Sequence, residues 1–216
     1  MIASEGKIIF IPMLLLLLIG ISINYLTNDS LNWIKYFNYF SLSFLLFTLY
    51  FFRNPKRKPI GTLKQMVSPA DGKVIQIINV DDPEIGNAKQ ISIFLSIFNV
   101  HSQYVPIDSN VISSNYFPGK YLLAFNHKTS NQNEQSVTLF KNEDNNKYKI
   151  KQIAGFIARR ILNYMNPNQF VIKGQRLGFI RFGSRVEIIV PRNNFDVIVK
   201  EGDKLKANIS TIGTFQ

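Results

Sequence analysis

Few residues in this chain have side chains suited to catalysis. Its 216 residues include two histidines, His101 in FNVHSQYVP and His127 in AFNHKTS, and no cysteine. Histidine titrates near neutral pH and can serve as a general acid or base, although a lone histidine is more often simply packed or solvent-exposed. Asp71 lies in SPADGKV, where the Asp-Gly pair is typical of a tight turn. These residues therefore leave a catalytic and a structural interpretation open.

A second unusual feature is the Gly183-Ser184 pair in LGFIRFGSRVEIIVP, which we predict to be a β-strand with the pair inside it. Glycine weakens a strand interior and marks a bulge, a bend or a close approach of the backbone. A serine hydroxyl needs an adjacent base to become a nucleophile. The GSR sequence is not a nucleophile elbow, and no Gly-rich loop precedes a helix, so hydrolase and nucleotide-binding functions lack support. No spacing of potential ligands indicates a metal site.

These residues lie in a region that the sequence pattern predicts to be mainly β. From Met66 onward, short segments rich in Ile, Val, Phe and Tyr alternate with turn residues, which is typical of a barrel or sandwich of short strands. GQRLGFI and GDKLKANI share the order Gly, polar, basic, Leu, which predicts repeated, lipoyl-like hairpin geometry within one barrel. GFIARRILNYMN, residues 155–166, is the one candidate for a short helix.

The first part of the chain is almost entirely apolar or aromatic. KIIFIPMLLLLLIGISINYL is long enough to cross a hydrocarbon core, and a second apolar segment begins near Trp33 after a polar break. We expect residues 1–52 to form a membrane-anchoring helical hairpin, 53–65 a basic linker and 66–216 the β domain that carries the candidate catalytic residues. A cleavable signal peptide is the competing interpretation, but no small-residue cleavage site follows the apolar run.

Charge indicates how the chain meets the membrane. The formal net charge is +11, and bases cluster after the second apolar segment, whereas the loop between the two segments contains no Lys or Arg. By the positive-inside rule, the β domain is expected on the cytoplasmic side of the cell membrane. A basic domain held at a bilayer favours an anionic membrane surface. Nucleic acid is the rival partner for such a charge, but the chain contains no recognisable binding motif for it.

Five segments, in this order, carry a resemblance to a known family: SPADGKV, SIFNVHSQYVP, YFPGKYLLAFNHKTSNQNEQ, QIAGFIARRI and GQRLGFIRFGSRVEIIVP. Together they resemble the short bacterial form of phosphatidylserine decarboxylase, a pyruvoyl-dependent enzyme, from about Arg53 to the C-terminus. The resemblance implies that the bond between Gly183 and Ser184 cleaves itself and that Ser184 becomes a pyruvoyl group, the covalent cofactor. The products would be a large chain, 1–183, and a small chain, 184–216.

The resemblance also implies roles for three residues. A Ser, His, Asp arrangement would carry out the cleavage, at the matching positions Ser184, His101 and Asp71. His101 would take the hydroxyl proton while Asp71 orients the imidazole, as in hydrolase triads. In the second reaction the pyruvoyl group would bind the amine of phosphatidylserine and act as an electron sink while carbon dioxide leaves. His101 would then return a proton, and phosphatidylethanolamine would be released.

The chain departs from the family pattern at three positions: Phe98, Phe117 and Gln135. The family commonly has histidine at the first two of these positions and arginine at the third. If that arginine binds headgroup charge, Lys128 or Arg185 would take its place here.

Two alternatives use the same residues differently. The first is a non-enzymatic, membrane-anchored adaptor with a lipoyl-like barrel, although such a protein would not require Gly183, Ser184, His101 and Asp71 together. The second is a pyruvoyl-dependent decarboxylase acting on another amino-acid headgroup. The sequence leaves the number of large and small chain pairs open.

Overall fold

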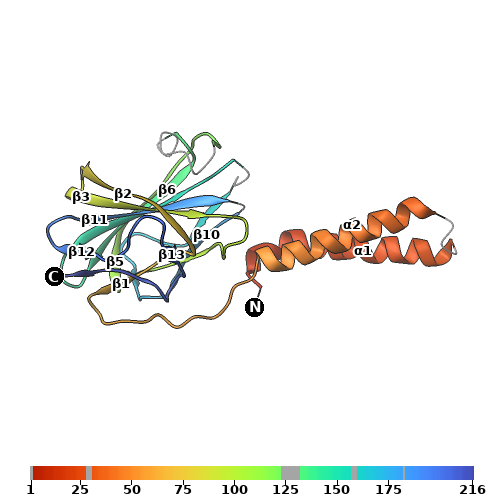
Figure 1. Ribbon diagram of the computed structural model, residues 1–216, viewed down its shortest axis with the longest axis horizontal. Helices are drawn as coiled ribbons and strands as arrows, with labels where there is room; N and C mark the ends of the chain where they lie inside the picture. The colour runs from red at the N-terminus through yellow and green to blue at the C-terminus, as the bar shows by residue number, and fades with distance from the viewer. Residues whose placement is uncertain (1, 28–30, 123–131, 157–159, 182) are drawn as a thin grey trace. The chain divides into compact units, whose positions relative to one another are not determined.

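The computed structural model describes most of the chain, namely residues 2–27, 31–122, 132–156, 160–181 and 183–216. The chain divides into two compact units, Met1–Lys56 and Arg57–Gln216. The first is helical and the second consists of β-strands (Figure 1).

The helical unit contains a 3-10 turn, Ser4–Gly6, and two helices, α1 (Lys7–Leu26) and α2 (Asn32–Phe51). Each helix has 20 residues, and a rise of 1.5 Å per residue makes each about 30 Å long, the thickness of a hydrocarbon core. The segment Ser4–Leu26 is the one helix among the described residues that is long and apolar enough to cross a membrane.

The two helices carry their apolar side chains on the outside. Their exposed residues are mostly Leu, Ile, Phe and Tyr, and the buried positions combine Gly20, Ser41 and Thr48 with the apolar residues Leu17, Ile34, Leu45 and Phe51. A side chain at Gly20 would collide with Asn38 of the other helix, so glycine permits the close approach. An apolar exterior, with glycine, serine and threonine among the buried contact positions, is the distribution expected for helices packed in lipid.

The β unit contains three sheets in which every described strand pairing is antiparallel. The largest has the order β13-β2-β3-β11-β7-β6-β5-β9. Its strands are β2 (Gly72–Asp82), β3 (Gly86–Leu95), β5 (Ser109–Phe117), β6 (Gln135–Asn142), β7 (Lys147–Ile153), β9 (Phe170–Val171), β11 (Ser184–Pro191) and β13 (Lys204–Leu205). The second sheet, β1-β14-β12, is formed by β1 (Gln65–Val67), β12 (Phe195–Val197) and β14 (Thr211–Phe215). The third, β4-β10-β8, is formed by β4 (Ser102–Tyr104), β8 (Ile161–Asn163) and β10 (Arg176–Ile180).

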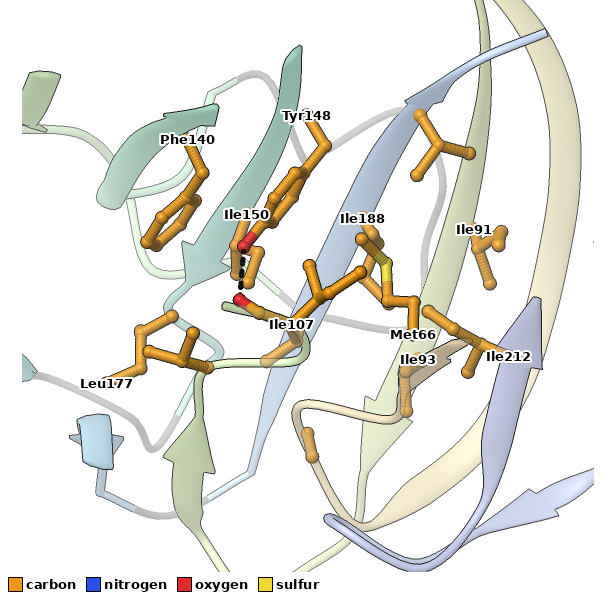
Figure 2. Close-up of a cluster of buried hydrophobic side chains, with 14 of the residues drawn as sticks. Met66, Ile91, Ile93, Ile107, Phe140, Tyr148, Ile150, Leu177, Ile188 and Ile212 are labelled. Atoms are coloured by element: carbon orange, nitrogen blue, oxygen red, sulfur yellow. Dashed lines mark hydrogen bonds between the residues drawn. The ribbon is translucent and has the colours of Figure 1, made fainter. Parts of the chain in front are cut away.

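The large sheet curls around a core of aliphatic and aromatic side chains. Figure 2 shows this cluster, in which Phe140 and Tyr148 stack with ring centroids 4.9 Å apart. The Tyr148 hydroxyl is paired with Ser109 Oγ at 2.8 Å and donates to the Ile107 carbonyl at 3.4 Å. Burial raises the pKa of this phenol, so it stays neutral and acts only as a hydrogen-bonding group.

The predicted fold class, mainly β and preceded by apolar helical structure, is confirmed. The two segments of the predicted repeat share a local geometry. Gly174 and Gly202 each have positive φ, lie two residues before a short strand (β10 and β13) and donate their N–H to a valine carbonyl. Hairpin geometry of the lipoyl type stays a prediction. The prediction of a helix in 155–166 is wrong for the described part of that segment. There, Ile161–Asn163 form strand β8, which pairs with β10.

Candidate active site

Gly183 lies in a connection between two sheets. β10 ends at Ile180 in one sheet and β11 begins at Ser184 in another, so the Gly-Ser pair is not inside a single strand as predicted from sequence. Gly183 has φ +64, a left-handed conformation that L residues rarely adopt. A Cβ added to Gly183 would meet nothing within 4 Å. Glycine is therefore favoured here by the backbone conformation and not by crowding.

Ser184 is the first residue of β11 and is fully buried, opposite Leu95 at the end of β3. Among the residues that the structure describes, its Oγ has no hydrogen-bond partner. A buried hydroxyl without a partner costs about 1–3 kcal/mol, and such groups are concentrated at functional sites. The hydroxyl of the serine predicted to react is thus desolvated and has no hydrogen-bond partner among the described residues.

His101 is fully buried beside the same junction. Its Nε2 lies 3.2 Å from the Gly183 amide nitrogen, and its Nδ1 lies 2.9 Å from the Asn99 carbonyl oxygen. A carbonyl can only accept and an amide N–H can only donate, so both contacts fit the same neutral tautomer, with the proton on Nδ1. Nε2 therefore has the lone pair that a general base requires, and here that lone pair accepts the N–H of Gly183, the residue before Ser184.

Asn99 fixes the turn that delivers this histidine. Its Oδ1 accepts hydrogen bonds from the Ser96 amide at 2.9 Å and from Ser96 Oγ at 2.8 Å. The turn follows directly after β3, and β3 is paired with β11, so His101 is carried to the start of β11. We did not identify Asn99 from sequence, although a Ser and an Asn three residues apart are a turn signal that could have shown it.

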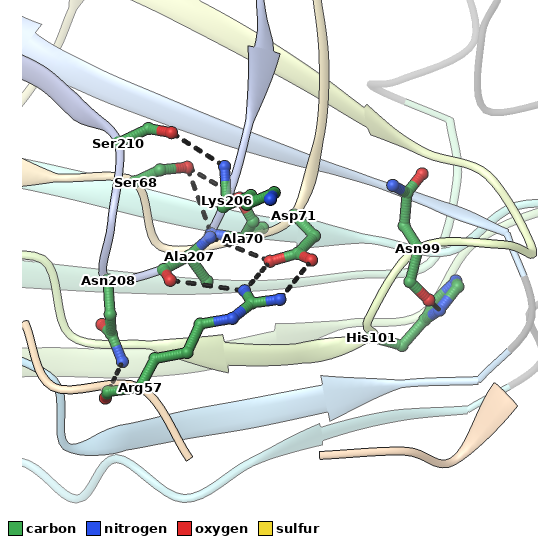
Figure 3. A network of polar contacts seen from close by, with 10 residues as sticks. All are labelled: Arg57, Ser68, Ala70, Asp71, Asn99, His101, Lys206, Ala207, Asn208 and Ser210. Carbon is green, nitrogen blue, oxygen red and sulfur yellow. Dashed lines mark hydrogen bonds and ion pairs between the residues drawn. The ribbon is translucent and has the colours of Figure 1, made fainter. Parts of the chain in front are cut away.

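Asp71 has different neighbours from those that the resemblance implies. Its carboxylate forms two hydrogen bonds with the Arg57 guanidinium, one of them 3.0 Å long, and accepts the Ala207 amide at 2.8 Å. Figure 3 shows the carboxylate facing Arg57, with the His101 ring lying apart from it. The group that orients the imidazole in this structure is the Asn99 carbonyl. The orienting role of Asp71 stays a prediction.

Arg57 was expected to belong to a basic linker. Its side chain contacts the β domain, where the hydrogen bond to Asp71 raises the pKa of the guanidinium against the opposing effect of burial. The sequence gives no local signal for this ion pair, because the partners are 14 residues apart and meet only through the fold.

Of the two residues predicted to bind headgroup charge, the structure describes only Arg185. Lys128, like His127, lies outside the described residues. Arg185 is 1% exposed and contacts other residues of the sheet, so the structure does not place it at an accessible surface. It shares one row across four strands with Ile153, Gln135 and Phe117. Two of the three departures from the family pattern are therefore direct cross-strand neighbours.

The fold and the site together describe a mainly β protein in which a buried histidine is hydrogen-bonded to the glycine that precedes a buried, unsatisfied serine. The family model for phosphatidylserine decarboxylase matches residues 44–213. Over 179 residues the chain is 44% identical to the phosphatidylserine decarboxylase proenzyme of Chlorobium chlorochromatii, covering 82% of each chain. The corresponding proteins of Prosthecochloris aestuarii and Syntrophus aciditrophicus are 40% and 42% identical, covering 80% and 81% of this chain and 79% and 82% of theirs. The chain belongs to the phosphatidylserine decarboxylase family.

Proposed function

We propose that this chain cleaves itself between Gly183 and Ser184 and then decarboxylates phosphatidylserine to phosphatidylethanolamine. The observation that carries the proposal is the buried, unsatisfied Oγ of Ser184 directly after Gly183, whose N–H is bonded to a neutral His101 through Nε2. The relatives named above are called proenzymes, which fits a precursor that is processed.

For the cleavage step, the neutral His101 takes the proton from Ser184 Oγ, and this oxygen attacks the Gly183 carbonyl carbon. The C–N bond breaks and an ester joins Gly183 to the serine oxygen. Loss of the α-proton of residue 184 then breaks the Cβ–O bond and releases the carboxylate of the large chain. Water adds to the resulting double-bonded residue and ammonia leaves, so that residue 184 ends in a ketone carbonyl. The positive φ of Gly183 supports the first step because it bends the chain at the bond under attack.

The residues present fit the pyruvoyl group that this sequence of steps would leave on residue 184. When formed, the group supplies an electron sink for the electrons released on decarboxylation. His101 contacts the junction through Gly183, and histidine is the residue type suited to general acid–base chemistry. We assign it the return of a proton to the substrate carbon. We propose that the Asp71 carboxylate, held in place by its ion pair with Arg57, stabilises the charged form of His101 without contacting it directly.

For location, we propose that 1–52 anchors the enzyme in the cell membrane with the β domain on the cytoplasmic side. The support comes from the apolar exterior of α1 and α2 and from the bases that follow α2. An anionic bilayer would then hold the basic β domain close to a lipid substrate.

The test is the intact mass of the purified protein together with its activity on defined vesicles. Two chains divided at Gly183, the smaller lighter than its sequence mass by one ammonia, would support the processing step. Release of carbon dioxide from phosphatidylserine, and not from vesicles with another amino-acid headgroup, would support the substrate. A Ser184→Ala chain should stay intact and inactive, and two normal fragments from it would refute the proposed site. A wild-type chain that stays whole would favour the non-enzymatic adaptor.

A further inference from the structure

Cleavage at Gly183 would turn an internal position of the chain into a chain end. The ends of strands fray unless they are tied down by backbone and side-chain contacts. In this chain the new end would carry the reactive carbonyl, so its position relative to His101 determines activity.

The start of β11 is held by its backbone on both sides. Ser184 and Arg185 pair with Leu95 and Phe94 of β3, and Arg185 also pairs with Ile153 of β7. Backbone pairing alone holds many strand ends only loosely, because the last pairs open most readily.

The Arg185 side chain adds contacts that reach across the sheet. One of its terminal nitrogens donates to Ser92 Oγ on β3 at 2.8 Å and to Gln76 Oε1 on β2 at 3.3 Å. Its Nε lies 2.9 Å from Glu187 Oε1, an ion pair without the alignment of a hydrogen bond. The second residue after the scissile bond is thus tied to two neighbouring strands, through Ser92 on β3 and Gln76 on β2, and to Glu187 on its own strand.

This arrangement is unusual because both charges are buried. Arg185 and Glu187 are each 1% exposed, and burial lowers the pKa of the guanidinium while the Glu187 carboxylate opposes that effect. Apolar residues of similar size commonly stabilise a fold at least as well as a buried ion pair. The ion pair restricts where the Arg185 side chain can lie, because a charged group in a dry site tolerates few positions other than beside its partner.

We propose that Arg185, held by Glu187 and Ser92, is a positioning residue that keeps the processed end of the small chain in register beside His101. The inference rests on the proposed function. The inference predicts that the contacts of Arg185 have different effects before and after cleavage. They matter little while the peptide bond is intact, because the continuous chain holds residue 184 in place. They matter after cleavage, when only the sheet holds it.

The test compares the two reactions in one double variant, Arg185→Met with Glu187→Gln, which removes both charges together. Lys149→Met with Asp82→Asn is the matched control, because it removes another buried ion pair of the same sheet, away from the scissile bond. Self-cleavage is followed by intact mass, and decarboxylation is measured per cleaved molecule on phosphatidylserine vesicles. Hydrogen exchange at the start of β11 is compared in cleaved protein and in an uncleaved Ser184→Ala background.

We expect the Arg185 double variant to cleave at nearly the wild-type rate and then to lose kcat by about tenfold or more, with KM little changed, as for a misplaced reacting group. Exchange at the start of β11 should rise only in the cleaved protein. The control pair should lower the unfolding temperature without separating the two reactions. If the double variant does not fold, Ser92→Ala removes a single contact of Arg185 and should show the same split at smaller size.

Three results would overturn the inference. Full decarboxylation by the cleaved variant would show that the contacts do not position the end. Equal losses in cleavage and decarboxylation would show a role in folding alone. A wild-type chain that neither cleaves nor decarboxylates would overturn the proposed function first, and this inference with it.

Discussion

Replacing Gly183 with alanine tests whether the left-handed backbone at the junction is needed for cleavage. Gly183 has φ +64, and an added Cβ meets nothing within 4 Å, so the substitution changes the backbone preference and creates no clash. An L residue in this region is disfavoured by about 1–2 kcal/mol. If attack requires this conformation, the competent fraction of molecules falls by the same free energy. We therefore expect self-cleavage to slow by about 5–30-fold and not to stop.

Two further variants separate this effect from general destabilisation. Gly202 also has positive φ, +98, with nothing within 4 Å of an added Cβ, so Gly202→Ala imposes a similar cost away from the site. It should lower stability and leave cleavage unchanged. Asparagine tolerates the left-handed region, and this chain has asparagine with φ between 62 and 65 at three positions: Asn145, Asn168 and Asn208. Gly183→Asn should therefore cleave faster than Gly183→Ala.

The assay is a pulse of cell-free synthesis into lipid vesicles followed by a chase, with the two fragments separated on a denaturing gel. The pulse defines the start of the cleavage reaction, which cannot be defined for protein purified from cells. Wild-type speed for Gly183→Ala would show that the conformation is incidental. Complete loss of cleavage in folded Gly183→Ala protein would show that the glycine serves for more than its φ angle. Either result, or an asparagine variant slower than alanine, would refute the reasoning.

Three other predictions concern His101, the ion pair between Lys149 and Asp82, and the apolar segment 1–52. His101→Gln keeps a hydrogen-bonding side chain but no base, so cleavage on the same gel should slow by about 10²–10⁴-fold, and a normal rate would exclude His101 as the base. Burial alone would raise the pKa of Asp82, but hydrogen bonds from Lys149 and from the backbone outweigh burial, so the pKa of Asp82 is lowered. The stability that this ion pair contributes is therefore present above pH ~4 and is lost as the pH falls further. Lys149→Met should therefore destabilise the protein by about 3 kcal/mol near neutral pH, measured by denaturant unfolding in detergent, and by less at pH ~3; an equal loss at both pH values would contradict this. Deleting 1–52 should move the β domain from the membrane pellet to the supernatant, and unchanged pelleting would show that the basic β domain binds lipid by itself.

The fold class was predictable because strands leave a period-two pattern in the sequence. The alternation in QISIFLSIF corresponds to the end of β3, where Ile91, Ile93 and Leu95 face the core. The same reasoning failed for Ile161–Asn163, because a segment of three residues is too short to show a period and is made a strand by pairing with β10. The pattern also could not show that Gly183 joins two sheets, since sheet membership is decided by partners distant in sequence.

The site was predictable only in part, for a related reason. Ser184 and His101 were named through a resemblance, and the structure brings them to one junction because β3 pairs with β11. Nothing local to Asp71 predicts its ion pair with Arg57, and the headgroup role expected for Arg185 ignored how deeply the sheet buries it. Charged residues are the hardest to place from sequence, because an exposed charge and a paired, buried charge look the same there.

The position of the proposed cleavage site explains how the domain would survive cleavage. On one side, β10 is held by β4 and β8; on the other, β11 is held by β3 and β7, so no sheet pairing is lost when the bond breaks. The small chain, 184–216, would supply strands to two sheets and several side chains to the core: Val186, Ile188, Val190, Phe195, Ile212 and Phe215. Apolar burial of this extent is worth about 1.5–3 kcal/mol for each large side chain. The two products should therefore stay together until the domain itself unfolds.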